Sequence, residues 1–228
     1  MTPWLDRLAA EVQARRVRIR ERALVIALAG GVASGKTTVA ERLARRLKRD
    51  GLTVEVVSTD GFLYPNAILA ERGLMERKGF PDSYDNRQLA AFLAEIKSGA
   101  PVLSVPSYSH AGYDVGAVQA LARPDVLILE GLIALQPDVE PVDLGLYLDA
   151  EEGDLIAWYT DRFLDLERWA SPRLAERLQA VGGDPEALAH DVWSRINGPN
   201  LREHIAPTRA RADVVLIKAR DHSIRLTD

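Results

Sequence analysis

Residues 30–37 have the residue types and the spacing of a phosphate-binding loop. They read Gly-Gly-Val-Ala-Ser-Gly-Lys-Thr, with four residues between the first glycine and the final Gly-Lys-Thr. Only a tight, glycine-rich turn at the start of a helix lets several backbone N–H groups converge on phosphate oxygens. In such a loop Lys36 contacts the β- and γ-phosphates, and the Thr37 hydroxyl binds Mg²⁺. The predicted cofactors are ATP and Mg²⁺, and the predicted nucleotide-binding residues are Gly30, Gly31, Val32, Ala33, Ser34, Gly35, Lys36, Thr37 and Thr38.

Two carboxylates stand where they could complete this site. Asp60 follows a predicted strand at 53–58, and Glu130 follows another at 126–129. Ligands of open α/β sheets collect at the carboxyl ends of the strands, so both side chains are expected to face the nucleotide. Phosphoryl transfer needs charge neutralisation and a group that accepts the proton of the acceptor hydroxyl. Asp60 is the candidate base and Glu130 a candidate metal ligand, although each precedes a glycine and a simple turn role stays open.

The elements that must position these residues follow from the hydrophobic pattern. Residues 24–29 form a continuous apolar run, as expected of a buried parallel strand. The next segment repeats apolar residues at Val39, Leu43 and Leu47, which predicts an amphipathic helix directly after the loop. This strand–loop–helix context supports the phosphate-binding interpretation.

The alternation of strands and helices continues along the chain. Strands joined by helices pair in parallel through right-handed crossovers. The predicted fold is therefore α/β, with a doubly wound, mostly parallel sheet flanked by helices, in a single domain 1–228 that has an N-terminal helix within 1–22 and a core at 24–221. Further helices are predicted at 4–22 and 87–97, and further strands at 144–148 and 214–217.

Composition narrows the class of protein. The chain has 228 residues, no cysteine and a formal net charge of −4. A protein that neutralises a nucleic-acid backbone needs an excess of basic residues, so the negative net charge argues against nucleic acid as the main partner. Without cysteine, neither a disulfide nor a thiolate metal site can form. The apolar runs are too short to span a bilayer. We expect a cytoplasmic enzyme that binds small molecules, with no nucleic acid or membrane as partner.

Beyond the loop, the sequence resembles bacterial type I pantothenate kinase, a member of the phosphoribulokinase and uridine kinase superfamily of P-loop kinases. The resemblance runs in order from about residue 24 to residue 221. It implies an ATP-dependent transfer of the γ-phosphate to a primary hydroxyl of pantothenate, the first step of coenzyme A synthesis, and a homodimer. The segments that carry it are 59–62, 71–75, 78–81, 83–85, 108–110, 113–114, 127–131, 158–159, 162–163, 207–209 and 218–222.

The resemblance also implies roles for single residues. Asp60 matches the catalytic carboxylate and Arg162 the arginine that stabilises charge growing in the transition state, so both join Lys36 as predicted catalytic residues. Helical spacing would bring Tyr159 and Arg162 to one side of a helix. Without the resemblance, Tyr159 would be read as a core aromatic and His110 as a structural or surface histidine. The implied substrate-binding residues are Tyr108, His110, Tyr113, Tyr159, Asn197 and Asn200; the predicted metal ligands are Thr37 and Glu130.

Several positions depart from the family pattern. Glu41 stands where the family has an arginine that meets the phosphates of inhibitory coenzyme A, so weak feedback inhibition is expected. Residues 171–180 lack an aromatic pair that closes over pantothenate, and only 23 residues precede the first strand, where the family has a longer segment that covers the nucleotide. Because such changes on the acceptor side can redirect specificity, two alternatives stay open. One is a related kinase for a nucleoside or sugar, and the other is a non-catalytic nucleotide-binding module.

Overall fold

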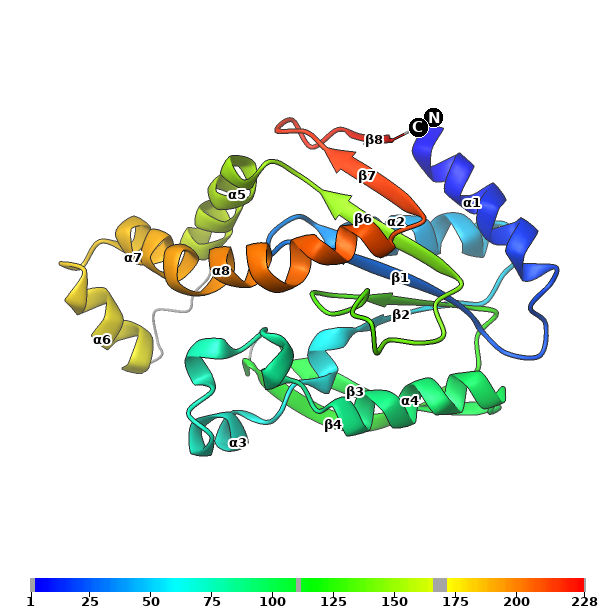
Figure 1. The fold of residues 1–228 in the computed structure, drawn as a ribbon, viewed down its shortest axis with the longest axis horizontal. Helices are drawn as coiled ribbons and strands as arrows, with labels where there is room; N and C mark the ends of the chain where they lie inside the picture. Colours follow the sequence, from blue (N-terminus) through cyan, green and yellow to red (C-terminus); the bar gives the residue numbers. More distant parts are fainter. Residues whose placement is uncertain (1–2, 110–111, 166–171, 228) are drawn as a thin grey trace.

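The computed structural model describes residues 3–109, 112–165 and 172–227, and it contains a six-stranded sheet of order β2-β5-β1-β6-β7-β8 (Figure 1). The first five strands of this order pair in parallel, and β8 is antiparallel to β7. The predicted fold class is therefore confirmed, while the predicted domain bounds stay predictions. The strands are β1 (Leu24–Gly30), β2 (Val54–Ser58), β5 (Val126–Glu130), β6 (Leu144–Asp149), β7 (Val214–Lys218) and β8 (Ile224–Leu226).

Strand β1 lies inside the sheet, between β5 and β6, and all of its residues are buried. This position explains its unbroken apolar sequence, because both of its faces are covered. Ile26 and its alternate neighbours pack with α1 (Pro3–Arg16) and α2 (Lys36–Arg49). Ala27 and its alternate neighbours join a second core with residues of α4 (Asn86–Ser98) and α5 (Glu152–Asp165). Helices thus cover both faces of the sheet.

The remaining elements lie mostly around the carboxyl ends of the strands and on the α4 side (Figure 1). The other α-helices are α3 (Asn66–Glu71), α6 (Pro172–Ala180), α7 (Pro185–Val192) and α8 (Gly198–Asn200). Two π-helical turns, Trp193–Asn197 and Leu201–Ile205, flank α8. Short 3-10 helices occur at Thr59–Phe62, Met75–Arg77, Pro81–Ser83 and Ala206–Arg211.

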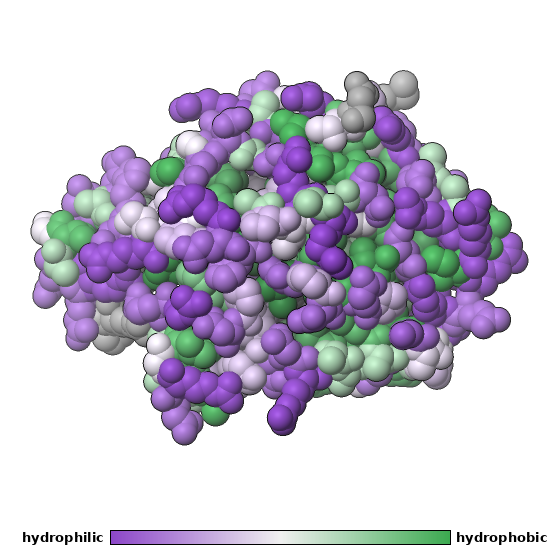
Figure 2. All heavy atoms as spheres, in the orientation of Figure 1, coloured by the Kyte–Doolittle hydropathy of each residue, from purple (hydrophilic) through white to green (hydrophobic). Residues whose placement is uncertain are grey.

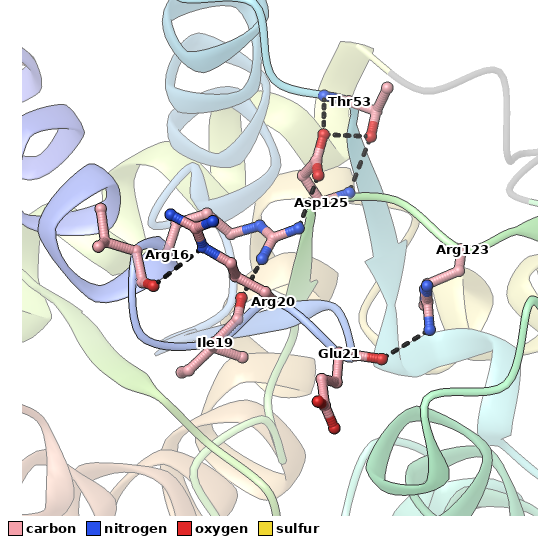
Figure 3. A network of polar contacts seen from close by, with 8 residues as sticks. Arg16, Ile19, Arg20, Glu21, Thr53, Arg123 and Asp125 are labelled. Carbon is pink, nitrogen blue, oxygen red and sulfur yellow. Dashed lines mark hydrogen bonds and ion pairs between the residues drawn. The ribbon is translucent and has the colours of Figure 1, made fainter.

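The N-terminal helix predicted at 4–22 is shorter than expected, because α1 ends at Arg16. There the guanidinium of Arg16 donates to the carbonyl of Ile19 and, at 2.7 Å, to the carboxylate of Asp125 (Figure 3). Asp125 also accepts hydrogen bonds from the backbone N–H and the hydroxyl of Thr53, at 2.9 and 2.8 Å. These contacts hold the chain as it turns into β1.

A separate antiparallel hairpin, absent from the sequence predictions, is formed by β3 (Val102–Ser109) and β4 (Asp114–Ala122). Its inner side packs on the α4 core through Leu103, which is fully buried. Polar side chains cover much of the face shown in Figure 2, and no helix among the described residues is long and apolar enough to cross a membrane.

Candidate active site

The phosphate-binding loop connects the end of β1 to the start of α2, as predicted. Helix α2 begins at Lys36, and no side chain caps its N-terminus. Gly35, just before it, has φ of 94°, a left-handed conformation that favours glycine. The buried ammonium of Lys36 donates to the carbonyl of Gly31 at 2.8 Å. A helix N-terminus with its first N–H groups available and a lysine beside it forms an anion site.

Glu130 lies next to this loop because β5 is the neighbour of β1, with Leu28 paired to Glu130. The Thr37 hydroxyl donates to a Glu130 carboxylate oxygen at 3.1 Å. Burial raises the pKa of Glu130, although the nearby Lys36 ammonium opposes that shift. Burial likewise lowers the pKa of Lys36, opposed by Glu130 and Asp60. The two carboxylates and the ammonium therefore share one poorly solvated site.

Thr37 and Glu130 are suitable ligands for Mg²⁺, which prefers oxygen donors and keeps several water or phosphate ligands. Their two oxygens lie 3.1 Å apart beside the phosphate loop. Among the residues that the structure describes, no group of three or more His, Cys, Asp or Glu side chains could hold a metal by itself. The arrangement fits an ion that is shared between the protein and nucleotide phosphates.

Asp60 is positioned by the short 3-10 helix that follows β2. Strand β2 pairs with β5 so that Ser58 is opposite Glu130, and the Ser58 hydroxyl accepts from the Asp60 N–H at 3.2 Å. Gly131 allows the two strand ends to approach closely, since a Cβ on Gly131 would lie 1.8 Å from the Thr59 hydroxyl. The sheet therefore brings the candidate base and the candidate metal ligand together.

Lys78 is a site residue that the sequence predictions missed. Its ammonium donates to the carbonyl of Tyr113 at 2.6 Å and to the Asn66 side chain at 2.7 Å. It also lies 3.9 Å from the ring centre of Tyr113 and 5.2 Å from that of Tyr108. Both predicted tyrosines thus surround one cation. The signal was present, since Lys78 belongs to the quoted segment 78–81, but a motif match alone did not show which side chains it meets.

The charge on Lys78 connects this cluster to the catalytic centre. Burial lowers its pKa to about 8, and the carboxylates of Asp114 and Asp60 oppose the shift. Asn200 contacts Gly79, the residue that follows Lys78. It is 2% exposed, and its side-chain amide donates to the Gly79 carbonyl at 2.8 Å, while its Oδ1 is buried without a hydrogen-bond partner.

Three further predicted residues are placed less directly. Asn197 lies half-buried in the π-helical turn before α8. Tyr159 on α5 packs in the core, with ring centres 5.7 Å from Phe163 and 5.6 Å from Trp193, so its surroundings are those of a core aromatic. Its role in substrate binding stays a prediction. His110 lies outside the described residues.

Arg162 is exposed on α5, three residues beyond Tyr159. After the larger effects of burial, Glu130 and Asp60, the positive charge of Arg162 makes a smaller contribution that lowers the pKa of Lys36. Glu130, Asp60 and Arg162 thus all influence the charge of Lys36, and their catalytic roles stay predictions.

Comparison with known proteins identifies the family. The sequence model of the phosphoribulokinase / uridine kinase family matches residues 25–225. This chain belongs to that family. The kinase is 47% identical to "Pantothenate kinase" of Sorangium cellulosum (strain So ce56) over 241 aligned residues, covering 96% of this chain and 78% of the relative. It is also 47% identical to "Pantothenate kinase" of Clavibacter michiganensis subsp. michiganensis, covering 91% of this chain and 70% of the relative.

A solved structure with the same fold comes from Silicibacter sp. TM1040, a protein with the provisional name fructose transport system kinase. Its TM-score is 0.75 at 25% identity, and the match covers 92% of this chain and 98% of that chain. The family match and the two relatives confirm the resemblance to bacterial type I pantothenate kinases. The kinase is a phosphotransferase that uses ATP with Mg²⁺ and acts on a small molecule.

Proposed function

We propose that this kinase transfers the γ-phosphate of ATP to the primary hydroxyl of pantothenate, the first step of coenzyme A synthesis. The observation that carries the proposal is the half-buried Lys78 between Tyr108 and Tyr113, electrostatically coupled to Asp60. A cation in this position complements an acceptor with a negative charge. Pantothenate carries a carboxylate, whereas nucleosides and simple sugars are neutral. The two relatives named above point to the same acceptor.

The proposed reaction divides the work among the clustered residues. Asp60 accepts the proton of the acceptor hydroxyl as its oxygen bonds to the γ-phosphorus, and the bond from that phosphorus to the β,γ-bridging oxygen breaks to release ADP. Lys36 and the loop N–H groups bind the phosphates, and Arg162 stabilises the charge that grows on them. Thr37 and Glu130 would hold Mg²⁺, which would neutralise phosphate charge when bound.

An acceptor panel tests this function. ADP release is measured with pantothenate, with uridine and with fructose, each at the same ATP and Mg²⁺ concentrations. The expected result is turnover with pantothenate at least tenfold above the other acceptors, because a site built to pair with a charged group discriminates against acceptors that lack it. Turnover with uridine or fructose alone would indicate a redirected kinase. No ADP release with any of the three acceptors would favour the non-catalytic alternative.

Weak inhibition by coenzyme A is a further expectation, which rests on Glu41. This residue lies one helical turn beyond Thr37 on the exposed face of α2, and its carboxylate lies 3.5 Å from the guanidinium of Arg45. A negative charge here repels the phosphates of coenzyme A. Coenzyme A should inhibit Glu41→Arg up to about fivefold more strongly than the natural protein, since one surface charge contact contributes about 0.2–1 kcal/mol. Equal inhibition constants would contradict this role.

We further propose that the kinase works in the cytoplasm as a homodimer, without nucleic acid or membrane as partner. The net charge of −4 supports the absence of a nucleic-acid partner. Light scattering on the purified chain tests the dimer, and a mass of 25.1 kDa would reveal a monomer.

A further inference from the structure

We propose that Lys218, at the end of β7, is a positioning residue that fixes the phosphate-binding loop in its nucleotide-binding shape. Its ammonium donates to the carbonyl of Ser34 at 2.8 Å, across 184 residues of sequence. In the sheet, β6 lies between β7 and β1, so the side chain reaches over one strand to meet the loop. The contact is made to the backbone of the loop itself.

The bonded carbonyl belongs to the peptide unit that precedes α2. A trans peptide is planar, so its C=O and the following N–H point in opposite directions. When Lys218 holds the Ser34 carbonyl on its side, the N–H of Gly35 is directed to the other side of the loop. A convergent set of such N–H groups is what binds phosphate. Lys218 therefore sets the direction of one donor of the site.

Lys218 is itself held in place from two other elements. Its ammonium lies 3.9 Å from the ring centre of Trp158 on α5, a cation–π contact. The Trp158 ring stacks on His222, with ring centres 5.0 Å apart and planes at 27°. A Cβ on Gly35 would lie 3.2 Å from the ammonium, so the loop leaves little room for another position. Helix α5 and the segment after β7 thus hold the lysine against the loop.

Lys36 and Lys218 both contact the phosphate-binding loop but have different tasks in this arrangement. Lys36 also binds a loop carbonyl, that of Gly31, but it stands at the N-terminus of α2, where the motif requires a contact with the β- and γ-phosphates. Lys218 stays on its carbonyl when nucleotide binds. Its loss should therefore weaken ATP and ADP alike, because both carry the β-phosphate that the loop surrounds. A direct contact with the γ-phosphate would instead weaken ATP alone.

The experiment measures binding of ATP and of ADP by calorimetry, without any acceptor. The Lys218 proposal depends on nucleotide binding by the kinase and not on pantothenate as acceptor. Either proposal can therefore fail while the other holds. In Lys218→Met both affinities should fall about tenfold or more, the loss of one charged hydrogen bond. Lys218→Arg, which keeps a charged donor, should recover most of the affinity. Lys97→Met, an exposed lysine in the last turn of α4, is the matched control and should bind like the natural protein.

Steady-state kinetics separate positioning from mere folding. Lys218→Met should raise the KM for ATP and leave the KM for the acceptor unchanged, whereas a partly unfolded protein would lose kcat with both KM values intact. Should the methionine variant lack a cooperative unfolding transition, Lys218→Gln takes its place with the same expectations. Unchanged ATP and ADP affinity overturns the proposal. So does a loss of ATP affinity with ADP affinity intact.

Discussion

Carboxylates lie at both ends of the parallel strands of the central sheet, called here its amino edge and its carboxyl edge. The two sets of carboxylates have different surroundings. At the amino edge, Asp143 precedes β6 and accepts two hydrogen bonds from the guanidinium of Arg22, at 2.6 and 2.8 Å, and one from the Val25 N–H at 2.8 Å. At the carboxyl edge, Glu130 ends β5 in a buried position and accepts from the Thr37 hydroxyl at 3.1 Å.

The directions of the pKa shifts express the same difference. Burial alone would raise the pKa of Asp125 at the amino edge, but the hydrogen bonds from Thr53 and Arg16 outweigh it, so the pKa is lowered. Burial raises the pKa of Glu130, and Lys36 offsets this only in part. The charged form is thus stabilised by folding at one edge and destabilised at the other. Neutralising substitutions should therefore damage stability at the amino edge and activity at the carboxyl edge.

The largest expected effect is that of Asp60→Asn. If Asp60 is the base for the acceptor hydroxyl, kcat should fall at least about a hundredfold, the usual contribution of general-base catalysis, with ATP affinity nearly unchanged. Turnover is measured by ADP release at saturating substrates, and affinity by calorimetry. Asp138→Asn, at an exposed position, is the control. Near-normal turnover of Asp60→Asn would remove the assignment.

Glu130→Gln should mainly change the requirement for metal. Loss of a carboxylate at the Thr37 side is expected to raise the Mg²⁺ concentration for half-maximal rate about tenfold or more. The rate is measured against Mg²⁺ at fixed ATP. The free energy of unfolding should not fall, because a carboxylate with a raised pKa opposes folding in its charged form. An unchanged Mg²⁺ dependence would contradict the metal role.

Asp143→Asn should show the reverse pattern at the other edge. The side chains of Asp143 and Arg22 are only 12% and 22% exposed, so removing the carboxylate charge leaves the poorly solvated guanidinium without its counter-charge. The free energy of unfolding should fall by about 2 kcal/mol, typical of hydrogen bonds to charged groups. Chemical denaturation measures this change, and kcat should stay within about twofold of the natural value. A large loss of kcat in a folded variant would break the contrast between the edges.

The smallest effect is a pH dependence due to Asp125. Its pKa is lowered in the folded protein, so its stabilisation is complete above the unfolded pKa of about 3.9 and disappears as the pH falls through the folded pKa. The difference in unfolding free energy between the natural protein and Asp125→Asn should therefore be larger at pH 7 than near pH 3. Equal differences at both pH values would show that the carboxylate charge is not what stabilises this edge.

Local sequence was sufficient for those parts of the molecule that depend on neighbours in the chain. The strand at 24–29 and the loop at 30–37 were predictable because burial and phosphate binding constrain consecutive residues. Asp60 and Glu130 could be selected because parallel strands end at one edge, although their catalytic roles stay predictions. Without the family resemblance, Tyr159 would be interpreted as a core aromatic residue, and its packing against Phe163 and Trp193 agrees with that interpretation.

Contacts between distant segments could not be predicted in this way. Helix α1 ends early because Arg16 binds Asp125, which is 109 residues away. The hairpin β3–β4 has no strong turn motif, and its second strand is largely exposed, so neither strand has the continuous apolar pattern of a buried one. Lys78 and Lys218 become recognisable only when the fold brings Tyr113 and Ser34 to them. The roles of these residues could be recognised only from the tertiary structure.

The central place of β1 has a consequence for how the protein is made. Both of its partners, β5 and β6, are later in the chain, since Leu24 pairs with Val126 and Gly30 with Leu148. A ribosome that has released the first 125 residues has already completed the phosphate-binding loop, yet β1 has no neighbour on either side. Because chains emerge from the N-terminus, a nascent kinase carries the completed loop from Thr37 onward, but both neighbours of β1 are present only after Leu148 has been added.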